Sequence, residues 1–223
     1  MLNYLESLTH PYCLHTAMSH EGSLNSPVCG LSRSGWVNLG ALLLVTVAYR
    51  LLTSHFDYLS NTAPLMAIAF GGAFLTGSRF WFVPVVILVI SDLILGLWHG
   101  QGGIGGYTFM SIGFYFFVGW IGGRAGKREK ILPLMWFGTL TCSVLFYVLA
   151  NSYSWMMWAG YDKSLAGWWQ SQTTGVPGIN PPAWTFLRNA LIADSVWCAI
   201  AGLMFFTEKR LGGESKSFVT EVN

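Results

Sequence analysis

The sequence predicts an all-α integral membrane protein with six transmembrane helices, and three observations support this fold class. Of the 223 residues, 53% are hydrophobic and 10% are charged, and the mean hydropathy is +0.49. Soluble domains carry about 25% charged residues. Apolar runs near the roughly 20 residues that a span requires recur along the chain. Basic residues flank these runs and do not form an aromatic-interleaved soluble face, so we expect no nucleic-acid partner.

The apolar runs and their flanking residues divide the chain into a tail, six spans and a second tail. Proline is tolerated in the first turn of a helix, where its missing N–H has no intrahelical partner, so Pro64 and Pro84 indicate helix starts. Residues 1–35 and 208–223 form polar tails around a transmembrane domain at residues 36–207. The predicted spans are Trp36 to Leu52, Asn61 to Leu75, Phe80 to Trp98, Tyr107 to Gly122, Leu132 to Ala150 and Ala183 to Phe206.

Charge placement predicts the orientation of these spans. If the N-terminus lies inside, Arg50, Lys163 and Arg188 fall outside the membrane or near the outer end of a span. The inner side then holds the more numerous basic residues Arg33, Arg79, Arg124, Lys127, Arg128, Lys130, Lys209, Arg210 and Lys216. By the positive-inside rule, both termini are cytoplasmic.

Polar residues in the outer half of the predicted bundle are candidates for ligand binding. Asp92 lies in the apolar run VPVVILVISDLILGLW, where an ionisable group costs several kcal/mol unless it faces protein or water. Asp92 therefore marks a functional or pairing site, or lies near enough to the interface to reach water. The alternative for each candidate is that it satisfies helix ends and its neighbours. The candidates are Asp92, His99, Asn151, Trp155, Trp158, Trp168, Arg188, Asn189 and Asp194.

The connection from Asn151 to Pro182 is the one loop long enough to have its own architecture. It contains Trp155, Trp158, Trp168 and Trp169. These aromatic residues form either an interfacial belt or a lid over a cavity, since aromatic rings stack on planar ligands. One loop can serve both purposes.

Small residues recur at four-residue spacing in the second predicted span. Ala63 and Ala67, and Ala69 and Ala73, form this pattern beside two glycines. Small side chains let another helix approach the backbone closely. We therefore predict that these four alanines pack against a partner helix.

The sequence contains no catalytic, nucleotide-binding or metal-binding motif that we recognise. The Cys13, His15, His20 and Cys29 spacing matches no zinc pattern. We predict that the protein is not an enzyme and holds neither a metal nor a cofactor. Without a P-loop, active transport requires an ion gradient or separate subunits.

Several stretches resemble a known family. NTAPLMAIAFGGAFL and VPVVILVISDLILG, followed by FYVLANSYSWMM, YDKSLAGWW and FLRNALIADSVWCAIAGLMFF, resemble an uncharacterised bacterial six-helix membrane family. That family is similar to the substrate-capture (S) components of energy-coupling factor vitamin transporters. The resemblance covers most of Asn61 to Phe206 and implies an S-component-like bundle that captures a micronutrient from the outer side.

The resemblance also implies a partner, because S components dock onto a transmembrane coupling subunit driven by two ATPases. Their docking alanines lie on the first helix, whereas the corresponding alanines here, Ala63 and Ala67 or Ala69 and Ala73, lie on the second. The N-terminal tail is a further departure from the compact pattern of that family.

We therefore expect a multi-pass protein of the bacterial inner membrane that binds a small, vitamin-like nutrient for uptake, together with separate energising subunits. One alternative is a structural or accessory subunit of a larger membrane complex. A membrane enzyme is a third possibility, and it requires Asp92, Asp194 and His99 to converge on one cavity.

Overall fold

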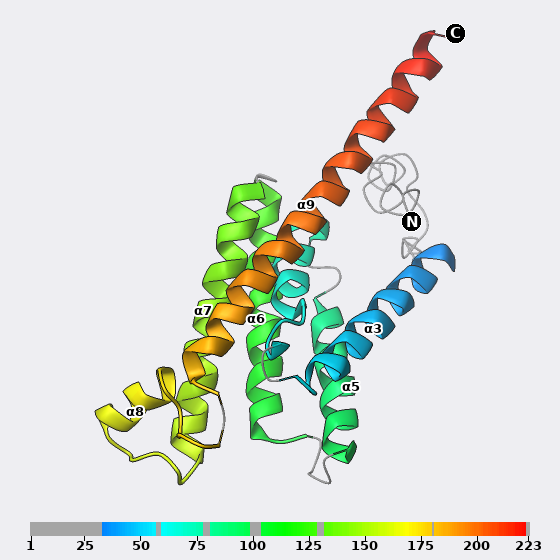
Figure 1. Cartoon of the computed structure of the whole chain (residues 1–223). Helices are drawn as coiled ribbons and strands as arrows, with labels where there is room; N and C mark the ends of the chain where they lie inside the picture. The colour runs from blue at the N-terminus through cyan, green and yellow to red at the C-terminus, as the bar shows by residue number, and fades with distance from the viewer. Residues whose placement is uncertain are drawn as a thin grey trace, which may run out of the picture. The chain divides into compact units, whose positions relative to one another are not determined.

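A computed structural model describes residues 33–56, 59–77, 81–98, 104–128, 132–179 and 181–221. These residues form helices joined by turns, with no strand among them, which confirms the all-α prediction for the described chain (Figure 1). The elements are α3 (Arg33–Thr53), the π-helix η3 (Ala67–Gly72), α4 (Ala73–Thr76), α5 (Phe82–Trp98), α6 (Gly106–Arg128), α7 (Leu132–Met157), α8 (Leu165–Gln172) and α9 (Ala183–Glu221).

Each predicted span corresponds to a helical element, and the differences lie at the ends. The second span is the continuous pair η3 and α4, which is shorter than predicted. Helix α7 extends to Met157, and α8 is an additional short helix within the aromatic loop. Helix α9 continues to Glu221, through most of the stretch expected to be a polar tail. Residues 1–32 of the predicted N-terminal tail lie outside the described residues.

Local sequence signals explain where these helices begin and end. Pro84 and Pro133 lie in the first turns of α5 and α7, and Pro182 directly precedes α9. The carbonyl of Pro64 accepts the N–H of Ile68 at 2.9 Å, which starts the helical turn leading into η3. Gly77 ends α4 at φ +79°, a backbone conformation that glycine adopts without steric cost.

Two helices of the described chain are long and apolar enough to cross a membrane: α7 over its whole length and α9 over Ala183–Leu203. Only 22% and 28% of their most apolar windows are buried inside the protein. The core helix of a soluble protein would be mostly buried, so these exposed apolar faces favour contact with lipid. The apolar helical stretches Gly40–Thr53, Ala67–Thr76 and Phe82–Trp98 are shorter.

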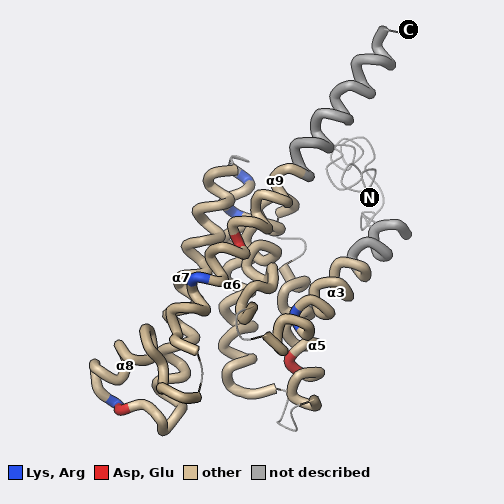
Figure 2. Tube along the Cα trace, viewed as in Figure 1, with Lys and Arg blue, Asp and Glu red and all other residues tan. Residues whose placement is uncertain are grey.

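The chain divides into two units. One comprises Met1–Leu44 and Leu203–Asn223, whose described residues belong to the first turns of α3 and the last part of α9. The other, Val45–Gly202, contains the remaining elements. Within this larger unit, α6 contacts η3, α4, α5 and α7, and α8 packs on α7. Charged residues are sparse along its helices, as Figure 2 shows.

Glycines on α6 allow the close approach between α6 and the pair η3 and α4. A Cβ atom added at Gly122 would lie 2.7 Å from the carbonyl oxygen of Phe70, and one at Gly126 would collide with the backbone of Phe74. Because these contacts are with backbone atoms, no rotation of a side chain could relieve them. The two helical segments therefore pack backbone to backbone at this crossing.

The four alanines predicted to meet a partner helix lie on or directly before the same segment. Ala69 and Ala73 are 1% and 3% exposed, and Ala67 is also buried. The close approach at this stretch therefore occurs within the chain, with α6 as a partner helix. Ala63 lines a cavity described below. Docking of a separate subunit stays a prediction, and it would have to use residues other than Ala69 and Ala73.

The glycine contact predicts a specific loss of stability. Gly122→Ala should lower the free energy of unfolding by about 1–3 kcal/mol, because its Cβ forces the α6 backbone away from Phe70. Thermal unfolding in detergent measures the effect. Gly113→Ala on the same helix is the matched control, since its Cβ would meet nothing within 4 Å. Equal melting temperatures for the two variants would contradict this packing.

Candidate functional site

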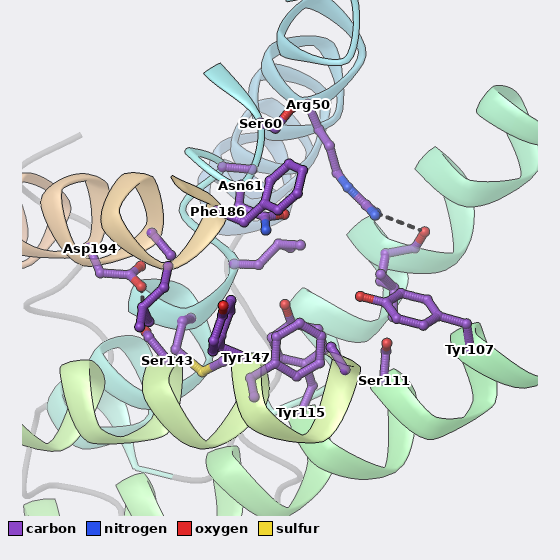
Figure 3. Close-up of a pocket in the computed structure, with 18 of the residues that line it drawn as sticks. Arg50, Ser60, Asn61, Tyr107, Ser111, Tyr115, Ser143, Tyr147, Phe186 and Asp194 are labelled. Atoms are coloured by element: carbon purple, nitrogen blue, oxygen red, sulfur yellow. Dashed lines mark hydrogen bonds between the residues drawn. The ribbon is translucent and has the colours of Figure 1, made fainter. Parts of the chain in front are cut away.

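The larger unit encloses a cavity of about 500 Å³, within the usual range for small-molecule sites. It lies where α3, α5 and α7 end and α6 and α9 begin (Figure 3). Non-helical residues that precede η3, among them Ser60 and Asn61, form part of its wall. Asn61 has φ +62°, which asparagine tolerates better than most residues. The cavity therefore occupies space beside the start of the shortened second segment.

Two helices present polar side chains to this cavity at helical spacing. Residues four apart lie on one face of an α-helix, so a polar series at this spacing forms a stripe. On α6 the stripe is Tyr107, Ser111 and Tyr115, and on α7 it is Ser143, Tyr147 and Asn151. Only Asn151 was a predicted site residue. The spacing is visible in the sequence and is the signal that would have found the other five.

One side of the cavity carries an ion pair between α3 and α5. Arg50 Nη2 lies 2.8 Å from Asp92 Oδ1, and the two side chains are 21% and 14% exposed. Arg50 Nη1 also donates to Ser91 Oγ and to the carbonyl of Leu88, while Thr108 donates to Asp92 Oδ2 at 2.9 Å. Because Thr108 belongs to α6, this network joins three helices. The charge of Arg50 is thus balanced by Asp92.

Another part of the wall carries Asp194 of α9, which is 3% exposed. Ser143 Oγ donates to Asp194 Oδ2, and the backbone N–H of Ala67 also donates to this carboxyl group. Both donors are neutral. Among the described residues, Asp194 has no cationic partner within salt-bridge distance. Figure 3 shows Asp194 and Arg50 on different sides of the cavity, with Asn61 and Phe186 drawn between them and Tyr115 and Tyr147 below.

Ser111 contributes a buried hydroxyl group without a partner. The residue is 0% exposed and lines the cavity, and its Oγ makes no hydrogen bond within the described structure. The Tyr107 phenol lies near this hydroxyl group, but the distance and angle between the two groups are not those of a hydrogen bond. A buried hydroxyl left unpaired costs free energy, so a molecule in the cavity that accepts this hydrogen bond would gain affinity.

A second cavity, of about 480 Å³, adjoins the first beneath the aromatic loop. Trp158, Tyr161 and Pro181 of the loop help to line it. Four residues line both cavities, which places the two next to each other: Tyr107, Asn151, Ser154 and Phe186.

Hydrogen bonds hold the aromatic loop against the end of α7. The Trp168 indole donates to Ser152 Oγ at 2.9 Å, and the Tyr147 hydroxyl donates to the carbonyl of Gln172. Ser164 caps the first turn of α8 by accepting the N–H of Gly167 at 3.2 Å. The loop is therefore an ordered cover over the second cavity.

Tyr161 lies on the inner side of this cover. The residue is 9% exposed, and burial raises the pKa of its phenol. Tyr161 therefore stays neutral at physiological pH and can act as a hydrogen-bond donor.

The predicted ligand-binding residues occupy different places. Asn151 and Asp194 line the first cavity, and Asn151 and Trp158 line the second. Asp92 lines neither cavity and instead forms an ion pair with Arg50, which lines the first. The indole N–H of Trp155 donates to the carbonyl of Asp162, and the indole N–H of Trp168 donates to Ser152 Oγ. His99 lies outside the described residues.

Arg188 and Asn189 were expected on the pocket wall and line neither cavity. The cavity face of α9 carries Phe186, Leu187, Ala190 and Asp194. At 100° per residue, position 188 points away from that face. The Arg188 guanidinium is exposed, donates to Asn189 Oδ1 at 3.1 Å and lies 5.3 Å from the ring centroid of Trp184.

Asn189 serves a structural contact instead. It is 7% exposed, and its Nδ2 donates to the carbonyl of Ser60 at 3.1 Å. This hydrogen bond ties α9 to the non-helical residues that precede η3. Asn189 thereby supports the cavity wall without lining the cavity.

Comparison with protein families matches residues 31–213 to a family described as "Family of unknown function (DUF6580)". The match spans every residue that lines the two cavities. No curated protein and no solved structure matches the chain.

The ion pair predicts a double-mutant result. Asp92→Asn should lower the free energy of unfolding by about 3 kcal/mol, because it leaves the Arg50 charge without its partner. The double variant Arg50→Met with Asp92→Leu should recover most of this loss, since it removes both charges. Denaturant titration in detergent measures both values. A double variant as unstable as the single one would contradict the assignment.

Proposed function

The chain belongs to the DUF6580 family of unknown function, and we propose that it is a membrane-embedded binding protein for uptake of a small, vitamin-like nutrient. The observation that carries the proposal is the cavity of about 500 Å³, which combines aromatic walls with a few convergent polar groups. Small-molecule sites have this composition, since apolar surface supplies affinity and polar groups fix orientation.

Six membrane crossings with both termini in the cytoplasm complete the proposal. The long helices α7 and α9 support it directly, while the shorter α5 and the pair η3 and α4 would be embedded among the others. The basic residues Arg124 and Lys127 lie at the end of α6 remote from the cavity-lining Tyr107. By the positive-inside rule that end faces the cytoplasm, so the cavity lies toward the outer side of the inner membrane.

The aromatic loop suits this orientation in both of its predicted roles. Trp169 and Leu165 are 63% and 80% exposed, as expected for residues at the outer membrane interface. Trp158 and Tyr161 line the second cavity from the same loop. We infer that the loop anchors at the interface and covers the entrance to the binding site.

Transport would require separate energising subunits, in line with the resemblance to S components. The sequence contains no P-loop, so ATP hydrolysis would be performed by a partner. The exposed aromatic face of α6 offers a surface for lipid or for such a subunit, with Phe109, Phe117 and Trp120 among its residues. A protein that is only an accessory subunit would not need an open polar cavity.

Filling the cavity should weaken binding. Ala190→Trp places a large side chain into the cavity from α9, and we expect it to reduce affinity at least about tenfold for any vitamin-like ligand found by equilibrium binding to purified protein. Ala199→Trp is the matched control, because it lies on the exposed side of the same helix. The control should bind as the wild type does.

A vitamin library that yields no ligand for the wild type would contradict nutrient binding. A stable stoichiometric complex that lacks any ATPase, recovered from the native membrane, would then favour an accessory subunit. Loss of binding in both tryptophan variants would show that the effect is not specific to the cavity.

A further inference from the structure

We infer that the cavity selects an organic cation, a protonated amine or quaternary ammonium carried on an aromatic or heterocyclic body, with Asp194 as its counter-charge. The inference deepens the proposed function and rests on it. It is based on the charge balance of the wall, the aromatic side chains around it and the unpartnered hydroxyl of Ser111.

Among Arg50, Asp92 and Asp194, the charged residues in or beside the cavity wall within the described structure, the two acidic residues outnumber the one basic residue. Arg50 and Asp92 form a pair at 2.8 Å, so Arg50 is not available to an anionic ligand without losing its partner. Among the described residues, Asp194 receives hydrogen bonds only from neutral donors, Ser143 and the N–H of Ala67. Arg188, the nearest cation along α9, is exposed and bonded to Asn189. Within the described part of the chain, the Asp194 carboxylate is therefore the group of the wall that a cationic ligand would balance.

The aromatic lining is suited to such a ligand. Tyr115, Phe146, Tyr147 and Phe186 all contribute to the wall. Aromatic ring faces attract cations, and the attraction strengthens where water is excluded. The same rings provide stacking surfaces for the planar body of a ligand. A cationic aromatic compound satisfies both kinds of contact at once.

Ser111 supplies the second, independent sign of a ligand. Its hydroxyl is fully buried, lines the cavity and has no hydrogen-bond partner among the described residues. It lies on α6, while Asp194 lies on α9, so one molecule can be held from two helices. The hydroxyl would orient a neutral polar atom of the ligand, and Asp194 would hold the charged one.

Charged thiol reagents test this inference directly, because they report the charge that the cavity prefers whatever its ligand is. Ser111→Cys is introduced into a chain whose four native cysteines are replaced by alanine. The cysteine is then labelled with 2-(trimethylammonium)ethyl methanethiosulfonate, a cation, or 2-sulfonatoethyl methanethiosulfonate, an anion. Each rate is divided by the rate of the same reagent with free 2-mercaptoethanol. We expect the cation to be favoured at least about tenfold, since the carboxylate acts on it through a weakly screened interior.

Asp194→Asn in the same background should reduce this preference to about twofold or less, because it removes the charge and keeps an acceptor for Ser143. Ser143→Ala is the control, since it removes a neutral contact of Asp194 and leaves the charge. It should retain the cation preference, and monodisperse elution in size-exclusion chromatography checks the fold of each variant.

The outcomes separate this inference from the proposed function. A preference for the anion, equal rates or a ratio unchanged by Asp194→Asn would overturn the assignment of a cationic ligand while leaving an accessible cavity. Failure of both reagents to label the cysteine would overturn the accessible cavity itself, and with it the proposed function.

Discussion

A polar group inside an apolar helix bundle needs a partner, either in the protein or in a bound molecule. This constraint explains the arrangement of the larger unit. Arg50 finds Asp92, and their network ties α3, α5 and α6 together. Among the described residues, Asp194 receives hydrogen bonds only from neutral donors, and the Ser111 hydroxyl has no hydrogen-bond partner. Within the same described part of the chain, Ser111 and Gln172 each carry a buried side-chain atom without a hydrogen-bond partner. Ser111 lines the same cavity as Asp194, which makes this cavity the candidate functional site.

The position of the cavity follows from the short helical segment formed by η3 and α4. Glycines on α6 permit backbone contact with η3 and α4, so that segment is buried deep in the unit. It is shorter than α5, α6, α7 and α9, and residues 60–64 before it are not helical. Those non-helical residues, held by Asn189 through Ser60, become cavity wall. The short segment of η3 and α4 therefore accounts both for the close packing against α6 and for the cavity beside its start.

Much of the fold could be predicted from the sequence, because apolar runs and prolines identify helices and their starts locally. The site was harder to predict. Asp92 and Asp194 could be identified from the sequence because they are charged residues in apolar runs. Serine and tyrosine indicate a site only when they recur at four-residue spacing, as on α6 and α7. Arg188 and Asn189 line neither cavity, because the direction of a side chain depends on helix phase. The pairing of Arg50 with Asp92 has no local signal, since it joins residues far apart in sequence.

The central claim is that a small molecule occupies this cavity in the native membrane. Native mass spectrometry of the protein, extracted from that membrane in mild detergent, tests it most directly. The account predicts a chain that carries one non-lipid small molecule at one-to-one stoichiometry, released on collisional activation. A chain that appears bare, or bound only to lipid, under conditions that preserve its fold would contradict the claim.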